Sequence, residues 1–278
     1  MRCVRLKTFL TPIVIFITTS LIAFVSSAEE TTRDNWTITL GLGVFHGPEY
    51  MGSDDAETML SPNFEVGWKD KVFLNPDGIS INYYRNDSIV LNAIVSQGDE
   101  REESLSTNLN GLGNIDTSTT LTLGAEIDLG LFISRANLTR HIGGTDGTQA
   151  IFGIETVIPL RMLTGKLNIE SMAETEDLTL IGPLIIAGVS ADWADDDYTR
   201  DFFGVNAEQS ADSGLPLHTA ESGFESVNLE LGVLYPVSKS WIVHGLAGYT
   251  KLIGDAKDSP VVKANDYIFI GALINYQF

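Results

Sequence analysis

Histidines, serines and carboxylates are the residues of this 278-residue chain that could carry out hydrolysis. A serine hydrolase needs a histidine beside its nucleophile and a third group that orients the histidine. The motif in which such a serine often lies, Gly-x-Ser-x-Gly, does not occur after residue 28. The four histidines, none of which lies in a recognisable nucleophile motif, are His46, His141, His218 and His244. We therefore predict no catalytic residue and no enzymatic activity.

Acidic residues gather in short clusters that a hard cation such as calcium could use, because calcium binds carboxylate oxygens. The clusters are Asp54–Asp55, Asp99–Glu100, Glu174–Asp177 and Asp195–Asp197. Their spacing fits no calcium-loop pattern of the D-x-D-x-D-G type, so solvated loop charge is the favoured interpretation. A second hypothesis is that divalent ions bridge these acids to anionic lipopolysaccharide. Neither a metal site nor a cofactor is predicted.

The segments that must position these residues alternate between apolar and polar or small side chains, which is the pattern of a β-strand. The final segment, Asp266–Phe278, places Ile268, Ile270, Ala272, Ile274 and Tyr276 on one face. A membrane barrel produces this pattern because one face of each strand meets lipid and the other faces the interior. The alternative is a half-buried strand of a soluble sandwich. The aromatic ending, with Tyr276 and Phe278, resembles the carboxy-terminal insertion signal of bacterial outer-membrane barrels.

Alternating segments recur along the whole chain after the first 35 residues. They are 36–44, 59–68, 72–84 (interrupted at Asn75–Gly78 by a bulge or tight turn), 88–96, 120–128, 131–141, 149–159, 165–173, 178–189, 225–235, 241–252 and 266–278. We therefore predict an all-β protein, a transmembrane antiparallel β-barrel of about twelve strands, within a range of about ten to fourteen. No break in composition divides it, so residues 29–278 are predicted to form a single domain.

The first 28 residues have the features of a cleaved signal peptide. Basic residues precede an apolar run, Phe9–Val25, and Ser26–Ala28 offers small residues for cleavage. A membrane-spanning anchor is the alternative, but the run contains Pro12 and no basic flank follows it. The protein is predicted to be exported.

Charge and cysteine content exclude further classes of protein. The formal net charge is −20, and the predicted cleavage removes three basic residues, so nucleic acid is not an expected partner. The only cysteine, Cys3, lies within the predicted signal peptide. A mature chain without cysteine has no disulfide framework and no thiolate metal site.

Three segments resemble the MipA/OmpV family of outer-membrane proteins, the MltA-interacting protein family. The first is 50–53, the second runs from Tyr198 to Gly223, and the third is 252–262. The residues that carry the resemblance are Tyr50, Gly52, Ser53, Tyr198, Phe203, Gly204, Val205, Gln209, Ser210, Ser213, Gly214, Leu215, Gly254, Asp255, Asp258, Ser259 and Pro260. His218 departs from the family pattern, in which a tyrosine is usual, although a ring is retained.

The resemblance implies a location in the outer membrane of a Gram-negative cell, in contact with lipid and lipopolysaccharide. For the founding member it also implies a scaffold that links a membrane-bound murein lytic transglycosylase to a murein synthase. Other members look like porin-like or adhesive surface proteins. The fold of the family is thus more uniform than its function.

Counting strands back from Phe278 predicts which loops share a side of the membrane, because the carboxy terminus of such barrels is periplasmic. This count places the three family segments together at the outer rim and 97–117 on the periplasmic side. Asp255, Asp258, Ser259 and Pro260 have the means to hold the outer loop rigid. The aromatic residues of the long loop either cover the barrel mouth or belong to an interfacial girdle; they are Trp193, Tyr198, Phe202 and Phe203.

Three functions remain open on the sequence. A structural scaffold without catalysis is favoured. A small channel is the second, and an acidic, glycine-lined lumen would make it select cations. An envelope enzyme acting on lipid is the third and has little support from individual residues.

Overall fold

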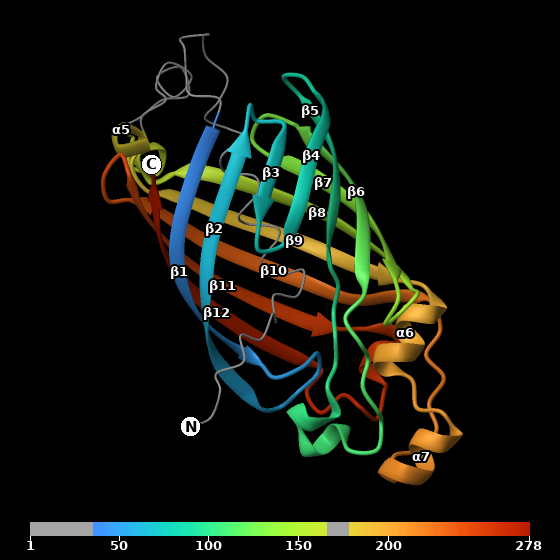
Figure 1. The fold of residues 1–278 in the computed structure, drawn as a ribbon. Helices are drawn as coiled ribbons and strands as arrows, with labels where there is room; N and C mark the ends of the chain where they lie inside the picture. Colours follow the sequence, from blue (N-terminus) through green and yellow to red (C-terminus); the bar gives the residue numbers. More distant parts are fainter. Residues whose placement is uncertain (1–35, 166–177) are drawn as a thin grey trace.

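A computed structural model describes residues 36–165 and 178–278 of the protein, and these residues form a closed barrel of twelve antiparallel strands (Figure 1). Each strand pairs with its neighbours in sequence, and β1 closes the barrel against β12. The strands are β1 (Trp36–Pro48), β2 (Ala56–Trp68), β3 (Val72–Asn75), β4 (Gly78–Arg85), β5 (Ile89–Gln97), β6 (Thr119–Asp128), β7 (Ile133–Ile142), β8 (Thr148–Pro159), β9 (Leu184–Ala194), β10 (Gly223–Pro236), β11 (Trp241–Leu252) and β12 (Asp266–Gln277). The prediction of an all-β antiparallel barrel of about twelve strands is confirmed. The predicted signal peptide lies outside the described residues.

Short helices occupy the connections between strands. They are η1 (Glu103–Leu105), η2 (Thr107–Leu109), α3 (Leu160–Leu163), α5 (Leu178–Ile181), α6 (Asp196–Phe203), α7 (Ala207–Ser213) and α8 (Gly254–Lys257). Within 36–165 and 178–278, no helix is both long enough and apolar enough to span a membrane.

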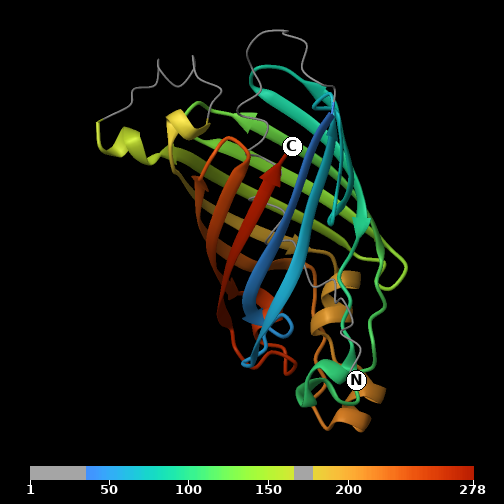
Figure 2. The same cartoon turned by 60° about the vertical axis from the view of Figure 1, so that its left-hand side comes forward.

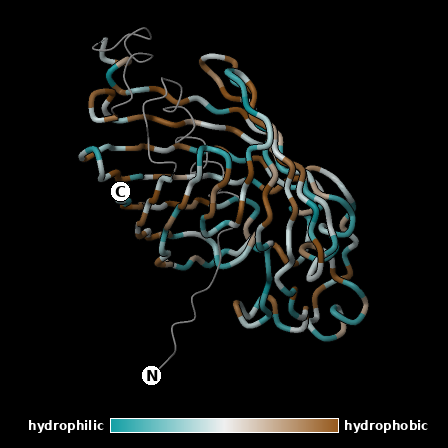
Figure 3. The backbone as a smooth tube through the Cα atoms, turned by 45° about the horizontal axis from the view of Figure 1, so that its top comes forward, coloured by the Kyte–Doolittle hydropathy of each residue, from teal (hydrophilic) through white to brown (hydrophobic). Residues whose placement is uncertain are grey.

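Alternation along each strand sends one set of side chains outward and the other into the barrel. In β12, Ile268, Ile270 and Ile274 are exposed, whereas Phe269 and Leu273 are buried inside. Figure 3 shows the resulting change between hydrophobic and hydrophilic positions along the strands. The outward positions form an exposed apolar belt, which is the surface that a lipid-facing barrel requires.

Two strand predictions differ from the structure between residues 72 and 84 and near residue 178. Asn75–Gly78 is a tight turn in which the Asp77 N–H donates to Asn75 Oδ1 over 3.0 Å, so 72–84 forms two strands rather than one. Residues 178–181 are helical, and β9 begins only at Leu184, after Gly182 with φ 83° and a proline. Proline has no N–H to give to a ladder, which explains why the strand starts after it.

The predicted strand 165–173 falls almost wholly outside the described residues. β8 pairs directly with β9, from Gln149 opposite Ala194 to Pro159 opposite Leu184. The barrel therefore closes without a strand between them, and the count of twelve is restored by the division of 72–84.

The barrel has two different ends. We call the end that holds Trp36 and Phe278 the terminal end, and the opposite one the loop end. Figures 1 and 2 show α6, α7 and the connection between β5 and β6 gathered at the loop end, away from the carboxy terminus. The prediction that 97–117 lies on the opposite side from the family segments is therefore wrong. The count ran back from Phe278, and the predicted strand 165–173 made it one too many: β8 pairs directly with β9, which reverses the side of this connection.

The interior of the barrel is not uniformly polar. An apolar cluster fills the part enclosed by β8 to β12 and β1, where the sequence predicted a polar lumen. Its buried members are Phe45, Ile181, Leu184, Ile186, Leu234, Leu246, Phe269 and Leu273. His244, predicted to face the interior, lies opposite Leu234 of β10 and Leu273 of β12, both of which belong to this cluster.

Candidate functional site

The three family segments come together at the loop end and form a cover over the barrel. Tyr50 is buried, and its hydroxyl donates to the Val261 carbonyl over 3.3 Å. Gly52 has φ 86°, and its carbonyl accepts the N–H groups of Lys263 and Ala264 at 2.7 and 3.0 Å. A Cβ on Gly52 would lie 2.7 Å from Val262 Cγ2, so glycine lets the first and third segments approach closely.

Helix α6 carries the second segment into the cover. Asp195 caps the helix by accepting the Tyr198 N–H over 3.1 Å. Burial alone would raise the pKa of Asp195, but hydrogen bonds from the backbone of Thr148 and Tyr198 lower it overall. The helix is amphipathic, with Phe202 and Phe203 on its buried side. The Gly204 N–H closes it by donating to Arg200 O over 2.9 Å.

Tyr198 is the central side chain of the cover and has no exposed surface. Its ring stacks on Phe202 with 4.5 Å between centroids, and its hydroxyl donates to Asp99 Oδ2 over 3.0 Å. Burial raises the pKa of Asp99, and the hydrogen bond from Tyr198 acts against that rise. Burial also raises the pKa of Tyr198 well above its usual value, so the phenol keeps the proton that it donates.

Helix α7 fixes the outermost part of the second segment. Asn206 and Gln209 form a reciprocal capping box at its start. Gln209 Nε2 also donates to Leu112 O over 2.8 Å, and Val205 pairs with His218 through both backbone groups. At the helix end, Ser210 Oγ donates to Leu215 O, Ser213 Oγ donates to Gln209 O, and Gly214 adopts φ 75°.

The third segment joins the other two. Gly254 has φ 57° and starts α8, and the Asp258 N–H donates to Asp255 O. Asp255 Oδ2 accepts the Glu221 N–H over 3.0 Å. Ser259 Oγ donates to Phe203 O over 2.5 Å, and Pro260 O accepts Lys263 Nζ over 2.9 Å. These contacts fit the rigid loop that the sequence predicts. Tyr276 and Phe278 lie at the terminal end, with ring centroids 4.8 Å apart.

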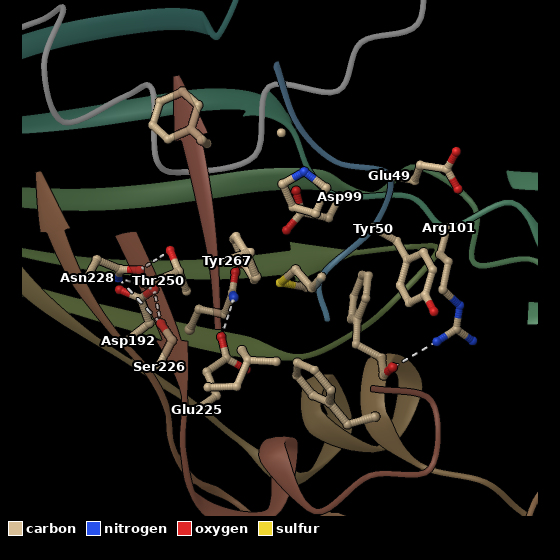
Figure 4. A pocket seen from close by; sticks show the side chains of 18 of the residues that line it. Glu49, Tyr50, Asp99, Arg101, Asp192, Glu225, Ser226, Asn228, Thr250 and Tyr267 are labelled. Atoms are coloured by element: carbon tan, nitrogen blue, oxygen red, sulfur yellow. Dashed lines mark hydrogen bonds between the residues drawn. The ribbon is translucent and has the colours of Figure 1, made fainter. Parts of the chain in front are cut away.

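A cavity of about 130 Å³ lies beneath the cover, inside the loop end of the barrel (Figure 4). Polar and charged side chains line part of it: Glu49, Asp99, Glu100, Arg101, Gln149, Asp192, Glu225, Ser226, Asn228 and Thr250. Aromatic and thioether side chains line the rest: Tyr50, Met51, Met59, Phe202, Phe203, Tyr267 and Phe269.

Two carboxylates on neighbouring strands form one wall of the cavity. Asp192 Oδ2 accepts hydrogen bonds from Ser226 Oγ at 2.7 Å and Asn228 Nδ2 at 2.9 Å, while Oδ1 is buried without a partner in residues 36–165 and 178–278. Glu225 Oε1 accepts a hydrogen bond from Gln149 Nε2 over 3.2 Å, and within the same described residues Oε2 is buried without a partner. The pairing of β9 with β10 slips between Phe224 and Ser226. This bulge leaves Glu225 and Ser226 both facing inward, where regular alternation would allow only one.

Arg101 forms the opposite wall, as Figure 4 shows. Its Nη1 donates to Phe202 O over 2.8 Å, whereas Nε and Nη2 are buried with no hydrogen-bond partner among the residues that the structure describes. Burial lowers the pKa of Arg101 to about 10, which still leaves the guanidinium charged at neutral pH. The cavity thus has carboxyl groups on one wall and a guanidinium on the other.

One arrangement near the cavity looks like a hydrolytic triad. Ser118 Oγ lies 2.9 Å from His141 Nδ1, and His141 Nε2 lies 2.9 Å from Gln149 Oε1. Ser118 and His141 are both 2 % exposed, and a Cβ placed on Gly98 would lie 2.2 Å from Ser118 Oγ. No substrate could reach the hydroxyl in this packing, so the arrangement serves as a buried polar network.

Sequence reasoning does not select the charged residues of the cavity. It assigns Asp99 to solvated loop charge and places the connection that holds Arg101 at the wrong end. Asp192 and Glu225 lie at inward positions near the loop ends of β9 and β10, beside Ser190, Ser226 and Asn228, and this run of polar inward residues is the one signal that could have identified them. The bulge that turns Glu225 inward is not visible in the sequence.

The sequence of this chain is similar to one protein family and to several named outer-membrane proteins. A family model described as "MltA-interacting protein MipA" matches residues 40–278. Outer membrane protein Omp26La of Vibrio anguillarum is 24% identical over 278 residues, covering 96% of this chain and 99% of the relative. Outer membrane protein OmpV of Vibrio cholerae is 23% identical with the same coverage. The MltA-interacting protein of Escherichia coli is 31% identical over 97 residues, which is 35% of this chain and 39% of that protein.

Proposed function

The chain belongs to the MltA-interacting protein MipA family of outer-membrane β-barrels, and from this premise we propose that it is a non-catalytic scaffold for a murein lytic transglycosylase. The protein is located in the outer membrane, as its relatives are named. The apolar belt of the barrel would contact membrane lipid, and the loop end would contact lipopolysaccharide. A murein synthase would be a further partner.

The main support for this proposal is that the loop end of the barrel is closed by packed side chains. Two clusters of buried side chains hold the connections 49–55, 98–118, 195–222 and 253–265 against one another. Leu109 and Tyr198 have no exposed surface, and Val261 is 1 % exposed. An apolar cluster fills part of the interior below this cover. A packed barrel of this kind favours a structural role over a wide aqueous pore.

A scaffold for murein enzymes must expose its binding surface on the periplasmic side. With the carboxy terminus periplasmic, that side is the terminal end. Among the described residues, its longest connection joins β8 to β9 and contains α3 and α5. Leu163 and Leu180 on these helices are 63 % and 58 % exposed, and Arg161 Nη1 ties the helices together by donating to Leu180 O over 2.5 Å. We propose this pair of helices as the partner surface.

The test is co-purification of the full-length protein with a membrane-bound lytic transglycosylase from gently solubilised envelopes. The double change Leu163→Ser and Leu180→Ser is expected to reduce recovery of the transglycosylase by at least about tenfold, since burying a leucine side chain contributes about 1.5–3 kcal/mol. Leu217→Ser is the matched control, because Leu217 is similarly exposed but lies at the loop end. Absence of the transglycosylase from the unaltered protein would contradict the scaffold role. Equal recovery by the double variant would contradict the proposed surface.

A cation-selective channel is the second candidate, and the inward-facing carboxylates of β6 and β8 favour it. Glu126 and Glu155 flank Arg135, whose nitrogens lie 3.6 and 2.5 Å from their oxygens. Single-channel recording of the refolded protein separates the two functions. Steady open steps would support the channel, whereas a silent bilayer would support the packed scaffold.

A further inference from the structure

The cavity under the cover presents carboxyl oxygens and guanidinium nitrogens that have no hydrogen-bond partner among the described residues, and we propose that it binds a small zwitterion of the amino-acid class, with one ammonium and one carboxylate. This inference is independent of the scaffold role, which uses the other end of the barrel. It accounts for buried polar atoms that the fold itself leaves without partners.

The wall formed by Asp192 and Glu225 would bind the ammonium group of the zwitterion. Glu225 is 5 % exposed, lines the cavity and has Oε2 free, and Asp192 Oδ1 is free beside it. A buried acceptor that loses its water and gains no donor destabilises the fold, and more so when it is charged. An ammonium group carries three N–H donors and a positive charge, so it would satisfy both oxygens together.

Arg101 would bind the carboxylate of the zwitterion. It lies in the connection between β5 and β6 and is 3 % exposed. The one hydrogen bond that its side chain makes within the described part of the chain uses Nη1, so Nε and Nη2 keep N–H donors without acceptors there. These two nitrogens lie on one edge of the guanidinium, the edge that binds a carboxylate in bidentate fashion. Figure 4 shows the guanidinium on one side of the cavity and the Asp192 and Glu225 wall on the other.

The volume of the cavity and its other lining residues limit the size and type of ligand that could bind. A volume of about 130 Å³ corresponds to roughly ten water-sized positions, which suits a molecule of about ten non-hydrogen atoms. Tyr50, Met51 and Phe269 supply an apolar lining that fits a short methylene chain. A metal ion is a weaker fit, because the described residues contain no group of three or more His, Cys, Asp or Glu side chains placed to hold one.

The experiment is calorimetric titration of the full-length protein in detergent with matched probes. 4-Aminobutyrate and 6-aminohexanoate carry both charges, whereas butylamine and butyrate carry one each. At least one zwitterion is expected to bind about tenfold more tightly than either single-charge probe. Glu225→Gln, which is isosteric, and Arg101→Gln are each expected to weaken that binding by about tenfold or more.

Exposed residues supply the controls. Glu208→Gln and Arg200→Gln change the same charges outside the cavity and are expected to leave binding unaltered. Heat-modifiable migration on gels verifies that each variant is folded, and Arg101→Lys replaces Arg101→Gln if the latter does not fold. No binding of any probe by the folded protein would overturn the proposal. Equal binding of butylamine, or binding of calcium or magnesium alone that Glu225→Gln abolishes, would also overturn it.

Discussion

The hydrogen bond between Tyr198 and Asp99 offers the sharpest test of how the loop end is closed. Tyr198→Phe removes the hydroxyl that donates to Asp99 Oδ2 at 3.0 Å and leaves the ring stack on Phe202 in place. Hydrogen bonds to charged groups are worth about 1.5–3 kcal/mol. The opening equilibrium of the cover is therefore expected to rise roughly tenfold to a hundredfold.

Hydrogen exchange followed by mass spectrometry measures this opening through the amides of α6. In Tyr198→Phe, the peptide that covers Asp196–Phe203 is expected to exchange faster, while peptides from β10 to β12 keep the wild-type rate. Tyr235→Phe is the control, because Tyr235 is 52 % exposed on the outer face of the barrel.

A double-mutant cycle with Asp99→Asn tests whether the effect comes from this one contact. If it does, Tyr198→Phe costs much less when Asp99→Asn is already present, and the coupling exceeds about 1 kcal/mol. Burial raises the pKa of Asp99, so its carboxylate becomes neutral as the pH falls, and the difference between Tyr198→Phe and the wild type should shrink with it. Wild-type exchange in Tyr198→Phe, or the same increase with and without Asp99→Asn, would refute the reasoning.

Two further predictions concern connections between strands: Gly147 lies between β7 and β8, and Asp77 lies between β3 and β4. Gly147→Ala would place a Cβ 2.4 Å from Tyr198 Cβ and 2.5 Å from the Tyr198 backbone nitrogen, so α6 must move. We expect this movement to cost about 1–3 kcal/mol of stability at the loop end. Limited proteolysis within 195–222 should then be faster, while the barrel still resists heat denaturation in detergent. Burial raises the pKa of Asp77 from 3.8 to about 6, so its contribution to stability is full below about pH 4 and is lost as the pH rises through 6. Asp77→Asn should flatten the change in apparent melting temperature between pH 4 and pH 8, and the exposed Asp87→Asn should leave it unchanged. An unchanged slope in Asp77→Asn would contradict this assignment.

Several strand boundaries could be predicted closely because alternation is a local property. The segment 241–252 is β11 as predicted, and 225–235 lies within β10. Strand boundaries were predicted wrongly where residues that favour turns could either interrupt a strand or end it. Asn75–Gly78 could be a bulge or a tight turn, and only cross-strand pairing distinguishes them.

The predicted strand 165–173 had a larger effect on the interpretation of the site. Sidedness depends on the parity of the strand count from Phe278, and β8 pairs directly with β9, so the connection 98–118 lies at the loop end. Asp99 and Arg101, which line the cavity, move with it. The family segments were nevertheless predicted to share one end. For 50–53 two errors in the count cancelled, because β8 pairs directly with β9 and 72–84 forms two strands.

The sequence alone determined the barrel, its strand spacing and its relation to the MipA family, because hydrophobic period and short motifs are encoded in neighbouring residues. The tertiary structure alone decided which charged side chains meet. Arg101 opposes Glu225 only because the connection after β5 folds over the mouth and because a bulge in β10 turns Glu225 inward. Both depend on contacts between residues far apart in the sequence, which no local pattern records.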